Sequence, residues 1–222
     1  MDIGKFLEIF SRLLTLLLVI PVHEAAHGLM AKWLGDDTAE RQGRITLNPF
    51  AHLDPIGSLL MLFTGFGWAK PVNVNPLRMK KYRAGFALTA LAGPVSNLIA
   101  AFAAGLVYNI LLATEAGLTA VLSNEITPLY CFMEILGFLF SINIGLAIFN
   151  LIPVPPLDGF NILRYFTSER VDRWFYMHQR EISIIFLILI FVVDIPLGFV
   201  TTKVGDLLWN AVSWIPALKW GW

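Results

Sequence analysis

The sequence has little charge, a single cysteine and no excess of either charge sign. Only 14% of its 222 residues are charged, whereas about 25% is typical of soluble domains. The 16 basic residues balance the 16 acidic ones, so nothing indicates a nucleic-acid partner. The lone Cys131 excludes an internal disulfide and a zinc site built from cysteines. With a mean hydropathy of +0.69, this composition indicates a membrane protein.

Long hydrophobic runs take the place of the missing charge. A membrane-spanning helix needs about 20 mainly apolar residues, and four stretches meet that requirement. They are residues 13–34, 84–114, 127–152 and 182–202. Because residues 13–22 are too few to span alone, the polar cluster at 23–27 has to lie at membrane depth. We predict an all-α polytopic membrane protein, with residues 1–222 forming a single membrane-embedded domain.

Shorter segments complete the predicted architecture. Residues 56–68 are apolar but too few for a crossing, which favours a re-entrant or interfacial segment. Residues 44–48 and 71–75 alternate like strands and predict a small β-hairpin between the first two spans. This hairpin could bind an unwound substrate by strand addition or simply lie at the interface. The tryptophan-rich end predicts an interfacial helix at residues 205–218.

Lysine and arginine are concentrated in two of the predicted loops. Residues 70–83 and 164–180 are rich in both, whereas residues 115–126 contain neither. The positive-inside rule therefore places the two basic loops in the cytoplasm. The first and third spans then run in the same direction, so their C-terminal halves lie at the same depth.

The motif with the clearest chemistry is His-Glu-Ala-Ala-His at residues 23–27. Histidines four residues apart face the same side of a helix, so both imidazoles can bind one zinc ion. A glutamate beside them can act as the general base on zinc-activated water. Structural histidines with an interfacial glutamate are the alternative, but burying such groups in lipid is costly unless a function requires them. We expect a metal site.

A third ligand has to come from another segment, because catalytic zinc usually has three protein ligands and one open position. The candidates are His52, Asp54, Glu134, Asp158, His178 and Asp194. Asp158 is the best placed, because it follows the third span on the same side as the two histidines. Prolines before it stop a helix, and unwound backbone in a membrane is a typical ion site. A surface aspartate after a helix-ending turn is the alternative.

Three motifs together resemble the site-2 protease family of intramembrane zinc metalloproteases. They are His-Glu-x-x-His at 23–27, Gly-Pro-Val-Ser-Asn at 93–97, and the segment 150–159 that ends Pro-Pro-Leu-Asp-Gly. They occur in the family's order. The resemblance implies a compact member of the family that lacks its PDZ and CBS domains.

The resemblance also implies the roles of individual residues. His23, His27 and Asp158 would bind zinc, and Glu24 would be the catalytic base. The implied reaction is hydrolysis of peptide bonds within or near transmembrane segments of membrane proteins, as in regulated intramembrane proteolysis.

Two asparagines beside these motifs have two open interpretations. Asn97 and Asn150 could donate hydrogen bonds to a developing oxyanion or to the substrate backbone. They could equally make hydrogen bonds between helices, and Asn97 could satisfy a kink at Pro94.

The expected partners are a transmembrane protein substrate and the lipid bilayer, with no nucleic acid, and a homo-oligomer is left open. We expect a multi-pass protein of a prokaryotic cell membrane, with its active site nearer the cytoplasmic face. A metal transporter or sensor is one alternative, but the ionisable groups cluster at one depth instead of marking a path across the membrane. A non-catalytic scaffold is another, which the intact motif disfavours. Glu134 and Asp194 receive no role.

Overall fold

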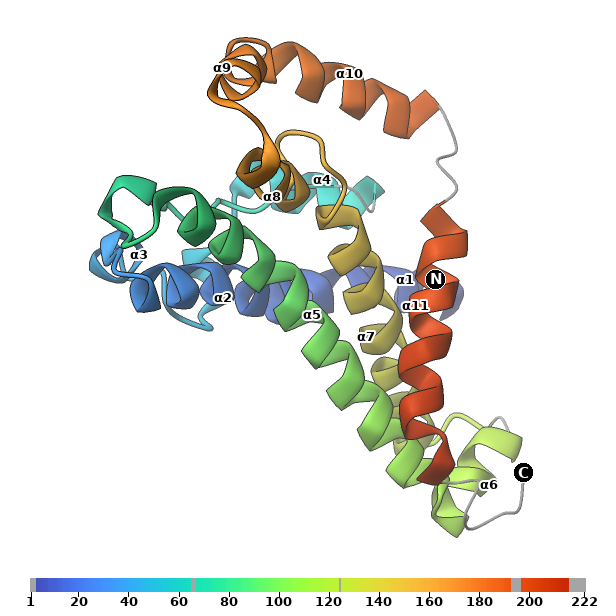
Figure 1. Ribbon diagram of the computed structural model, residues 1–222. Coiled ribbons are helices and arrows are strands. Elements are labelled where there is room, and N and C mark those ends of the chain that lie inside the picture. Colours follow the sequence, from blue (N-terminus) through green and yellow to red (C-terminus); the bar gives the residue numbers. More distant parts are fainter. Residues whose placement is uncertain (1–2, 65–66, 124, 193–196, 216–222) are drawn as a thin grey trace. The chain divides into compact units, whose positions relative to one another are not determined.

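The computed structural model describes residues 3–64, 67–123, 125–192 and 197–215. These residues are mostly helical, as Figure 1 shows, and this confirms the predicted helical class. In chain order the helices are α1 (Ile3–Leu14), η1 (Thr15–Val19), α2 (Ile20–Trp33), α3 (Thr38–Arg41), η2 (Pro49–Ala51), α4 (Pro55–Thr64), η3 (Pro76–Arg78), α5 (Tyr82–Leu112), α6 (Glu115–Ser123), α7 (Pro128–Asn150), α8 (Asp158–Phe166), α9 (Glu169–Met177), α10 (Gln179–Val192) and α11 (Leu197–Val212).

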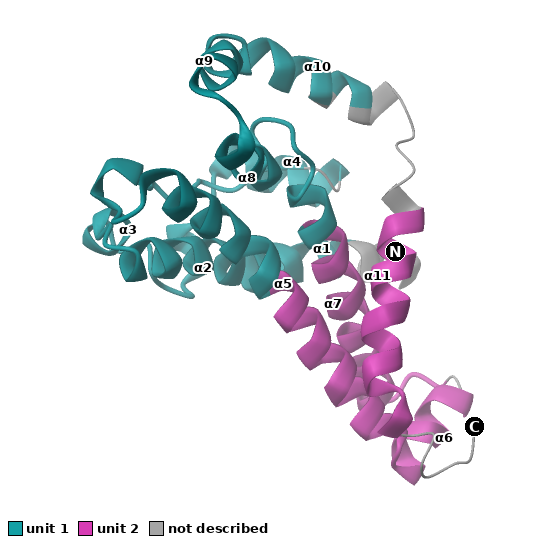
Figure 2. Cartoon of the chain, in the orientation of Figure 1, with its two compact units in different colours: residues 1–96, 147–197 teal, residues 97–146, 198–222 magenta. Residues whose placement is uncertain are grey.

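The chain divides into two compact units, which Figure 2 shows in different colours. Unit 1 comprises residues 1–96 and 147–197, and unit 2 comprises residues 97–146 and 198–222. The boundaries fall inside α5 and α7, which contribute to both units, and after the first residue of α11. The His-Glu-x-x-His motif and Asp158 both belong to unit 1.

Three helices among the described residues are long and apolar enough to cross a membrane. They comprise Ile9–Trp33, Tyr82–Leu112 and Pro128–Asn150, and they coincide with the first three predicted spans. Over the predicted fourth span, α10 ends at Val192 and α11 begins at Leu197. Residues 193–196, with Asp194, lie outside the described part of the chain, so the fourth span stays a prediction.

The first of these helices changes its winding just before the histidine motif. The N–H of Ile20 donates to the carbonyl of Thr15, five residues back, so the turn η1 is π-helical. Pro21 follows and has no N–H to donate, which removes one hydrogen bond of an α-helix. Such single π-turns are frequent at functional sites, and this one starts the helix segment that carries the motif.

The predicted β-hairpin is not confirmed. Residues 44–48 and 71–75 have no regular secondary structure, and no strand occurs in the described ranges. The one antiparallel pairing there is an isolated bridge between Leu53 and Ala69, continued by a hydrogen bond from the Lys70 N–H to the carbonyl of His52.

Side chains explain why the pairing does not extend beyond this single bridge. The buried guanidinium of Arg44 donates to the carbonyls of Ala51 and Pro71. Nε2 of His52 lies 2.9 Å from the carbonyl oxygen of Thr46. These side chains bond carbonyl oxygens that a strand ladder would otherwise use, an effect that alternation in the sequence does not reveal.

The predicted re-entrant or interfacial segment is largely helix α4. Its N-terminus is capped by Asp54, whose Oδ1 accepts hydrogen bonds from the N–H groups of Ile56 and Gly57. Its other end accepts a hydrogen bond from Arg12 of α1 at the carbonyl of Leu62, at 2.8 Å. Residues 65–66 lie outside the described part, and whether α4 re-enters the membrane stays a prediction.

Unit 2 is built around aromatic contacts of α11. The ring of Trp209 lies 5.5 Å from that of Tyr108 on α5 and 5.5 Å from that of Phe140 on α7. A Cβ at Gly105 would lie only 3.0 Å from Phe140, so glycine permits this close packing. Helix α11 includes residues 205–212 of the predicted interfacial helix. Residues 216–218 lie outside the described part.

Candidate metal centre

His23 and His27 face each other on α2 with their ring nitrogens close together. Their Nε2 atoms are 3.0 Å apart, and their rings meet edge to face at 87°. Each Nε2 atom lies 3.3 Å from Oδ2 of Asp158. Both histidines are buried and Asp158 is half-buried. Two imidazoles and a carboxylate from distant parts of unit 1 therefore converge on one point.

These distances fit a tetrahedral zinc ion. Ligand atoms about 2.0–2.1 Å from such an ion are separated from one another by roughly 3.3 Å, and the observed separations are 3.0 and 3.3 Å. Oδ2 of Asp158 is buried and makes no hydrogen bond of good geometry. Unpaired buried oxygens are costly, and a cation between the three atoms would remove that cost.

Asp158 is ionised in this environment. Burial by itself raises the pKa of Asp158, but the imidazoles of His23 and His27 beside its carboxylate more than offset burial, and the pKa is lowered to about 2. A carboxylate that stays charged at neutral pH is the form that binds a divalent cation.

The ring of His27 is oriented by α5. Its Nδ1 lies 2.7 Å from the backbone carbonyl oxygen of Thr89. A carbonyl can only accept a hydrogen bond, so Nδ1 carries the proton and the lone pair of a neutral imidazole is left on Nε2. This is the tautomer that a histidine needs to bind a metal ion through Nε2. Sequence reasoning missed Thr89, because the contact is made by its backbone.

Gly93 allows α5 to pass the two histidine rings. A Cβ atom at Gly93 would lie 2.5 Å from Cε1 of His23 and closer still to Nε2 of His27. Any larger residue would therefore clash with both imidazole rings. The sequence marks Gly93 as a position of interest, since it opens the Gly-Pro-Val-Ser-Asn motif. It does not show that the histidine rings require the space.

Glu24 lies beside the cluster and is held by a backbone amide. Its Oε2 accepts a hydrogen bond of 3.0 Å from the N–H of Val72. The segment 71–75 runs along α2 here, since a Cβ at Gly28 would be 3.7 Å from the side chain of Val72. Glu24 is half-buried, and one of its carboxylate oxygens is thereby oriented. Val72 was not singled out by its sequence.

Asp158 is the first residue of α8, and the chain before it is tightly packed. A Cβ at Gly159 would lie 2.6 Å from the carbonyl oxygen of Ile152, so glycine lets the preceding backbone pass against the helix start. The hydroxyl of Ser183 on α10 donates to the carbonyl of Pro155 at 3.1 Å. The unwound segment predicted here is thus present and fixed.

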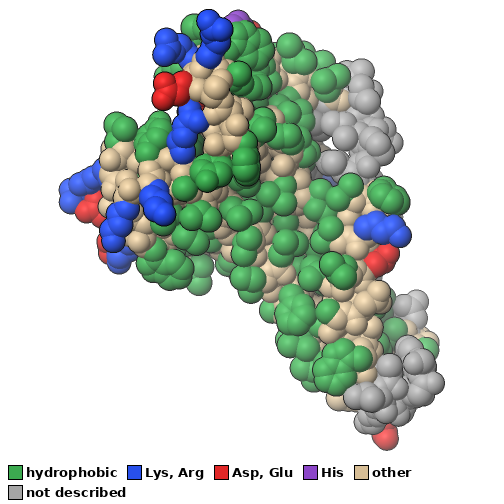
Figure 3. Space-filling model, in the orientation of Figure 1, with side chains coloured by type: hydrophobic (Ala, Val, Ile, Leu, Met, Phe, Trp, Pro, Cys, Tyr) green, Lys and Arg blue, Asp and Glu red, His purple; other side chains and the backbone are tan. Residues whose placement is uncertain are grey.

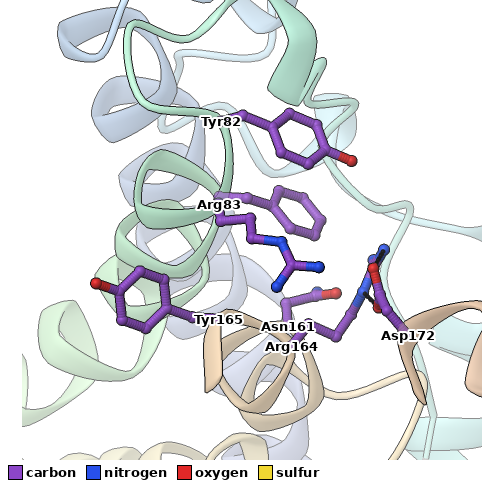
Figure 4. Close-up of a pocket in the computed structure, with 7 residues that line it drawn as sticks. Tyr82, Arg83, Asn161, Arg164, Tyr165 and Asp172 are labelled. Carbon is purple, nitrogen blue, oxygen red and sulfur yellow. Dashed lines mark hydrogen bonds and ion pairs between the residues drawn. The ribbon is translucent and has the colours of Figure 1, made fainter. Parts of the chain in front are cut away.

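The other end of α8 is clamped to α5 and α9, as Figure 4 shows. Arg164 makes two hydrogen bonds to Asp172, of 2.5 and 3.1 Å, which raise the pKa of Arg164. Its guanidinium lies 5.5 Å from the ring centre of Phe86. Arg83 donates to the carbonyl of Thr167 at 2.6 Å. These contacts hold the helix that carries Asp158.

Of the six candidates for the third ligand, Asp158 reaches the histidines within the described part of the chain. Asp54 caps α4, and His178 bonds the carbonyl of Trp174 on its own helix. His52 is bonded to Thr46. Glu134 is exposed, and Asp194 lies outside the described residues.

The two predicted asparagines are not part of the three-residue cluster. Asn97 is buried on α5, about one turn after Gly93, and belongs to unit 2. Asn150 is the last residue of α7 and is half-buried. Their proposed roles stay predictions.

Comparison with known proteins decides the family. The profile of Peptidase family M50 matches residues 11–193. The chain belongs to peptidase family M50. This confirms the resemblance to site-2 proteases, and the chain is accordingly a zinc-dependent metalloendopeptidase with helices long enough for a membrane protein.

Two relatives of this M50 member support the assignment. "Putative zinc metalloprotease YwhC" of Bacillus subtilis (strain 168) is 39% identical over 200 residues, which cover 90% of this chain and 84% of the relative. "Putative zinc metalloprotease Rip2" of Mycolicibacterium smegmatis is 28% identical over 162 residues, which cover 71% of this chain and 57% of the relative. No solved structure matches the chain.

Proposed function

We propose that His23, His27 and Asp158 hold the zinc ion of this M50 peptidase and that Glu24 is its catalytic base. The observation that carries the proposal is the convergence of the three ligand atoms at 3.0–3.3 Å. The oriented tautomer of His27 and the space at Gly93 support it. Zinc, when bound there, supplies Lewis-acid activation of water and of the peptide carbonyl.

Glu24 moves the proton in the proposed reaction. Its carboxylate accepts a proton from the attacking water as the new C–O bond forms at the peptide carbonyl carbon. It then delivers that proton to the nitrogen of the leaving amine as the C–N bond breaks, so the carboxylate is regenerated. Because Oε2 accepts the hydrogen bond from the Val72 N–H, Oε1 is the oxygen that we assign to the proton transfer. Asn97 and Asn150 remain proposed donors to the oxyanion or substrate backbone.

The proposed substrate is the transmembrane segment of another membrane protein. The histidine motif lies within the first candidate span, so a peptide bond that reaches it has to enter the membrane. A substrate helix has to unwind there, because the carbonyls of an intact helix are already hydrogen-bonded.

We propose the following membrane arrangement. Residues 1–222 form one multi-pass domain of a prokaryotic cell membrane, with four spans and with α4 as a re-entrant or interfacial helix. The active site opens toward the cytoplasmic face, which the basic loops 70–83 and 164–180 support. The three proposed ligands all come from one chain, and a homo-oligomer stays open.

Metal analysis and cleavage separate the roles of these residues. Purified wild type should contain about one zinc ion per chain, and His23→Ala, His27→Ala and Asp158→Ala should lose most of it. Glu24→Gln should keep zinc and lose cleavage of a reconstituted single-pass substrate by at least about 100-fold. The matched control His178→Ala should keep both. Full zinc content in Asp158→Ala would remove the third ligand, and wild-type cleavage by Glu24→Gln would remove the base.

A further inference from the structure

Helix α9 has an exposed face that combines arginines with large apolar side chains. Arg170, Arg173, Trp174 and Met177 are all exposed, with Trp174 at 50% and Met177 at 64%. Their spacing of i, i+3, i+4 and i+7 places them on one side of the helix. Figure 3 shows Lys and Arg side chains over α9 with hydrophobic side chains beside them. The catalytic machinery uses none of these four residues.

The opposite side of α9 is packed against α8, which fixes the direction of this face. Asp172 is bound by Arg164 through two hydrogen bonds. The ring of Phe175 lies 5.2 Å from that of Phe160, edge to face. Asp172 and Phe175 lie half a turn or so away from Arg170 and Trp174. The helix therefore cannot rotate its arginines and its tryptophan inward while these contacts persist.

A candidate membrane span precedes α8 and α9 in the chain, and a helix with an exposed apolar face follows them. The candidate span α7 ends at Asn150, before α8 and α9. Helix α10 begins right after α9 and exposes Ile184, Ile185, Ile188 and Leu189 at helical spacing. A helix held between two such elements stays close to the surface of the bilayer.

We propose that α9 lies on the membrane surface and binds anionic phospholipid headgroups. Arg170 and Arg173 supply charge complementary to the phosphates, and Trp174 and Met177 enter the interfacial layer. A mixed basic and aromatic face suits this boundary, because tryptophan prefers the headgroup level and basic side chains reach the lipid phosphates. Glu169 lies at the edge of the face, and Asp172, the other acidic residue of α9, is already paired.

Spin labels on neighbouring residues test the proposal directly. In a Cys131→Ser background, a nitroxide is attached at Met177→Cys on the proposed face or at Tyr176→Cys beside it. Tyr176 is also exposed, at 74%, so it is a matched control. The full-length protein is reconstituted in vesicles of phosphatidylcholine with or without phosphatidylglycerol. Collision rates with oxygen and with a water-soluble nickel chelate are then measured.

We expect the label at 177 to collide mainly with oxygen, and the label at 176 mainly with nickel, in vesicles that contain phosphatidylglycerol. The difference should shrink in pure phosphatidylcholine. Arg170→Gln with Arg173→Gln should abolish the effect of phosphatidylglycerol, because two interfacial arginines change the balance between bound and free by roughly 30-fold.

Two results would overturn the proposal. Equal nickel access at 176 and 177 in both kinds of vesicle would show that α9 stands in water. Protection of position 177 from both reagents would show that a protein surface, such as a second copy, covers it. Neither readout involves zinc or cleavage, so failure here leaves the proposed protease site untouched.

Discussion

The Nδ1 atom of His27 lies 2.7 Å from the backbone carbonyl oxygen of Thr89, and this contact joins the motif helix to α5. Four residues further along α5, Gly93 provides the space into which the imidazoles of His23 and His27 project. Helix α5 thus orients the ring of His27 and leaves room for the rings of both histidines. At its start, Phe86 contacts Arg164 of the helix that carries Asp158, and Arg83 bonds Thr167 directly after that helix. The first turns of α5 therefore align ligands from two separate segments.

Gly93→Ala should impair zinc binding without unfolding the protein. The new methyl group would lie 2.5 Å from Cε1 of His23, so the rings have to move apart. We expect zinc affinity to fall by about 10–100-fold, the range seen when the surroundings of a metal ligand are disturbed. Competition with a chromophoric chelator measures this.

Gly137→Ala on α7 is the matched control. A Cβ at Gly137 meets nothing within 4 Å, and alanine is favoured over glycine inside a helix by about 1 kcal/mol. This variant should bind zinc like the wild type and be no less stable. Equal zinc affinity in the two alanine variants would show that Gly93 is not needed for the site.

Val72→Pro should slow catalysis while zinc remains bound. Proline has no N–H, so Oε2 of Glu24 would lose its 3.0 Å hydrogen bond. We expect kcat to fall by about tenfold or more, because a misplaced base transfers protons poorly, while KM changes little. Val72→Ala keeps the N–H and should retain kcat. An unchanged kcat in the proline variant, with zinc content intact, would contradict a positioning role for this amide.

Asp172→Asn should loosen the clamp on α8. Arg164 would lose its charged partner in a half-buried setting, which we expect to cost about 1–2 kcal/mol of unfolding free energy and several-fold in zinc affinity. Thermal unfolding and chelator competition measure the two effects. Glu40→Gln removes an exposed ion pair with Lys32 and should cost less than about 1 kcal/mol. If Asp172→Asn matched Glu40→Gln in both assays, the Arg164–Asp172 contact would not be needed to hold Asp158 in place.

Asp36 predicts a dependence of stability on pH. It is buried, and its carboxylate accepts hydrogen bonds from the N–H and hydroxyl of Thr38 and the N–H of Asn75. Burial by itself raises the pKa of Asp36, but the hydrogen bonds from Thr38 and Asn75 and the charge of Arg78 more than offset it, so the pKa is lowered. The folded state therefore favours the charged form of Asp36 more than the unfolded state does.

The sign follows from linkage. A group whose pKa is lowered on folding contributes stability above its unfolded pKa, about 3.9, and this contribution is lost as pH falls through the folded pKa. Asp36→Asn should be about 1–3 kcal/mol less stable than wild type at pH 7. The gap should narrow below about pH 4. A gap that stays constant in thermal unfolding between pH 7 and pH 3 would contradict the assignment.

The helical class, three of the spans and the histidine pair could be predicted from the sequence. Each depends on a local pattern: apolar runs of sufficient length, and two histidines four residues apart on one helix. The strand prediction at 44–48 and 71–75 was not confirmed, and the side chains of Arg44 and His52 there bond the carbonyls of Pro71 and Thr46. Alternating hydrophobicity carries no information about such contacts.

Which acidic residue meets the histidines was decided by the tertiary structure. Asp54 and Asp158 are both acidic residues near the start of a helix, but Asp54 caps its own helix while Asp158 lies 3.3 Å from both rings. The roles of Thr89 and Val72 depend on backbone groups, which every residue possesses and no motif marks. Spacing within one helix is set by its 3.6-residue turn, whereas distances between helices depend on how the whole of unit 1 packs.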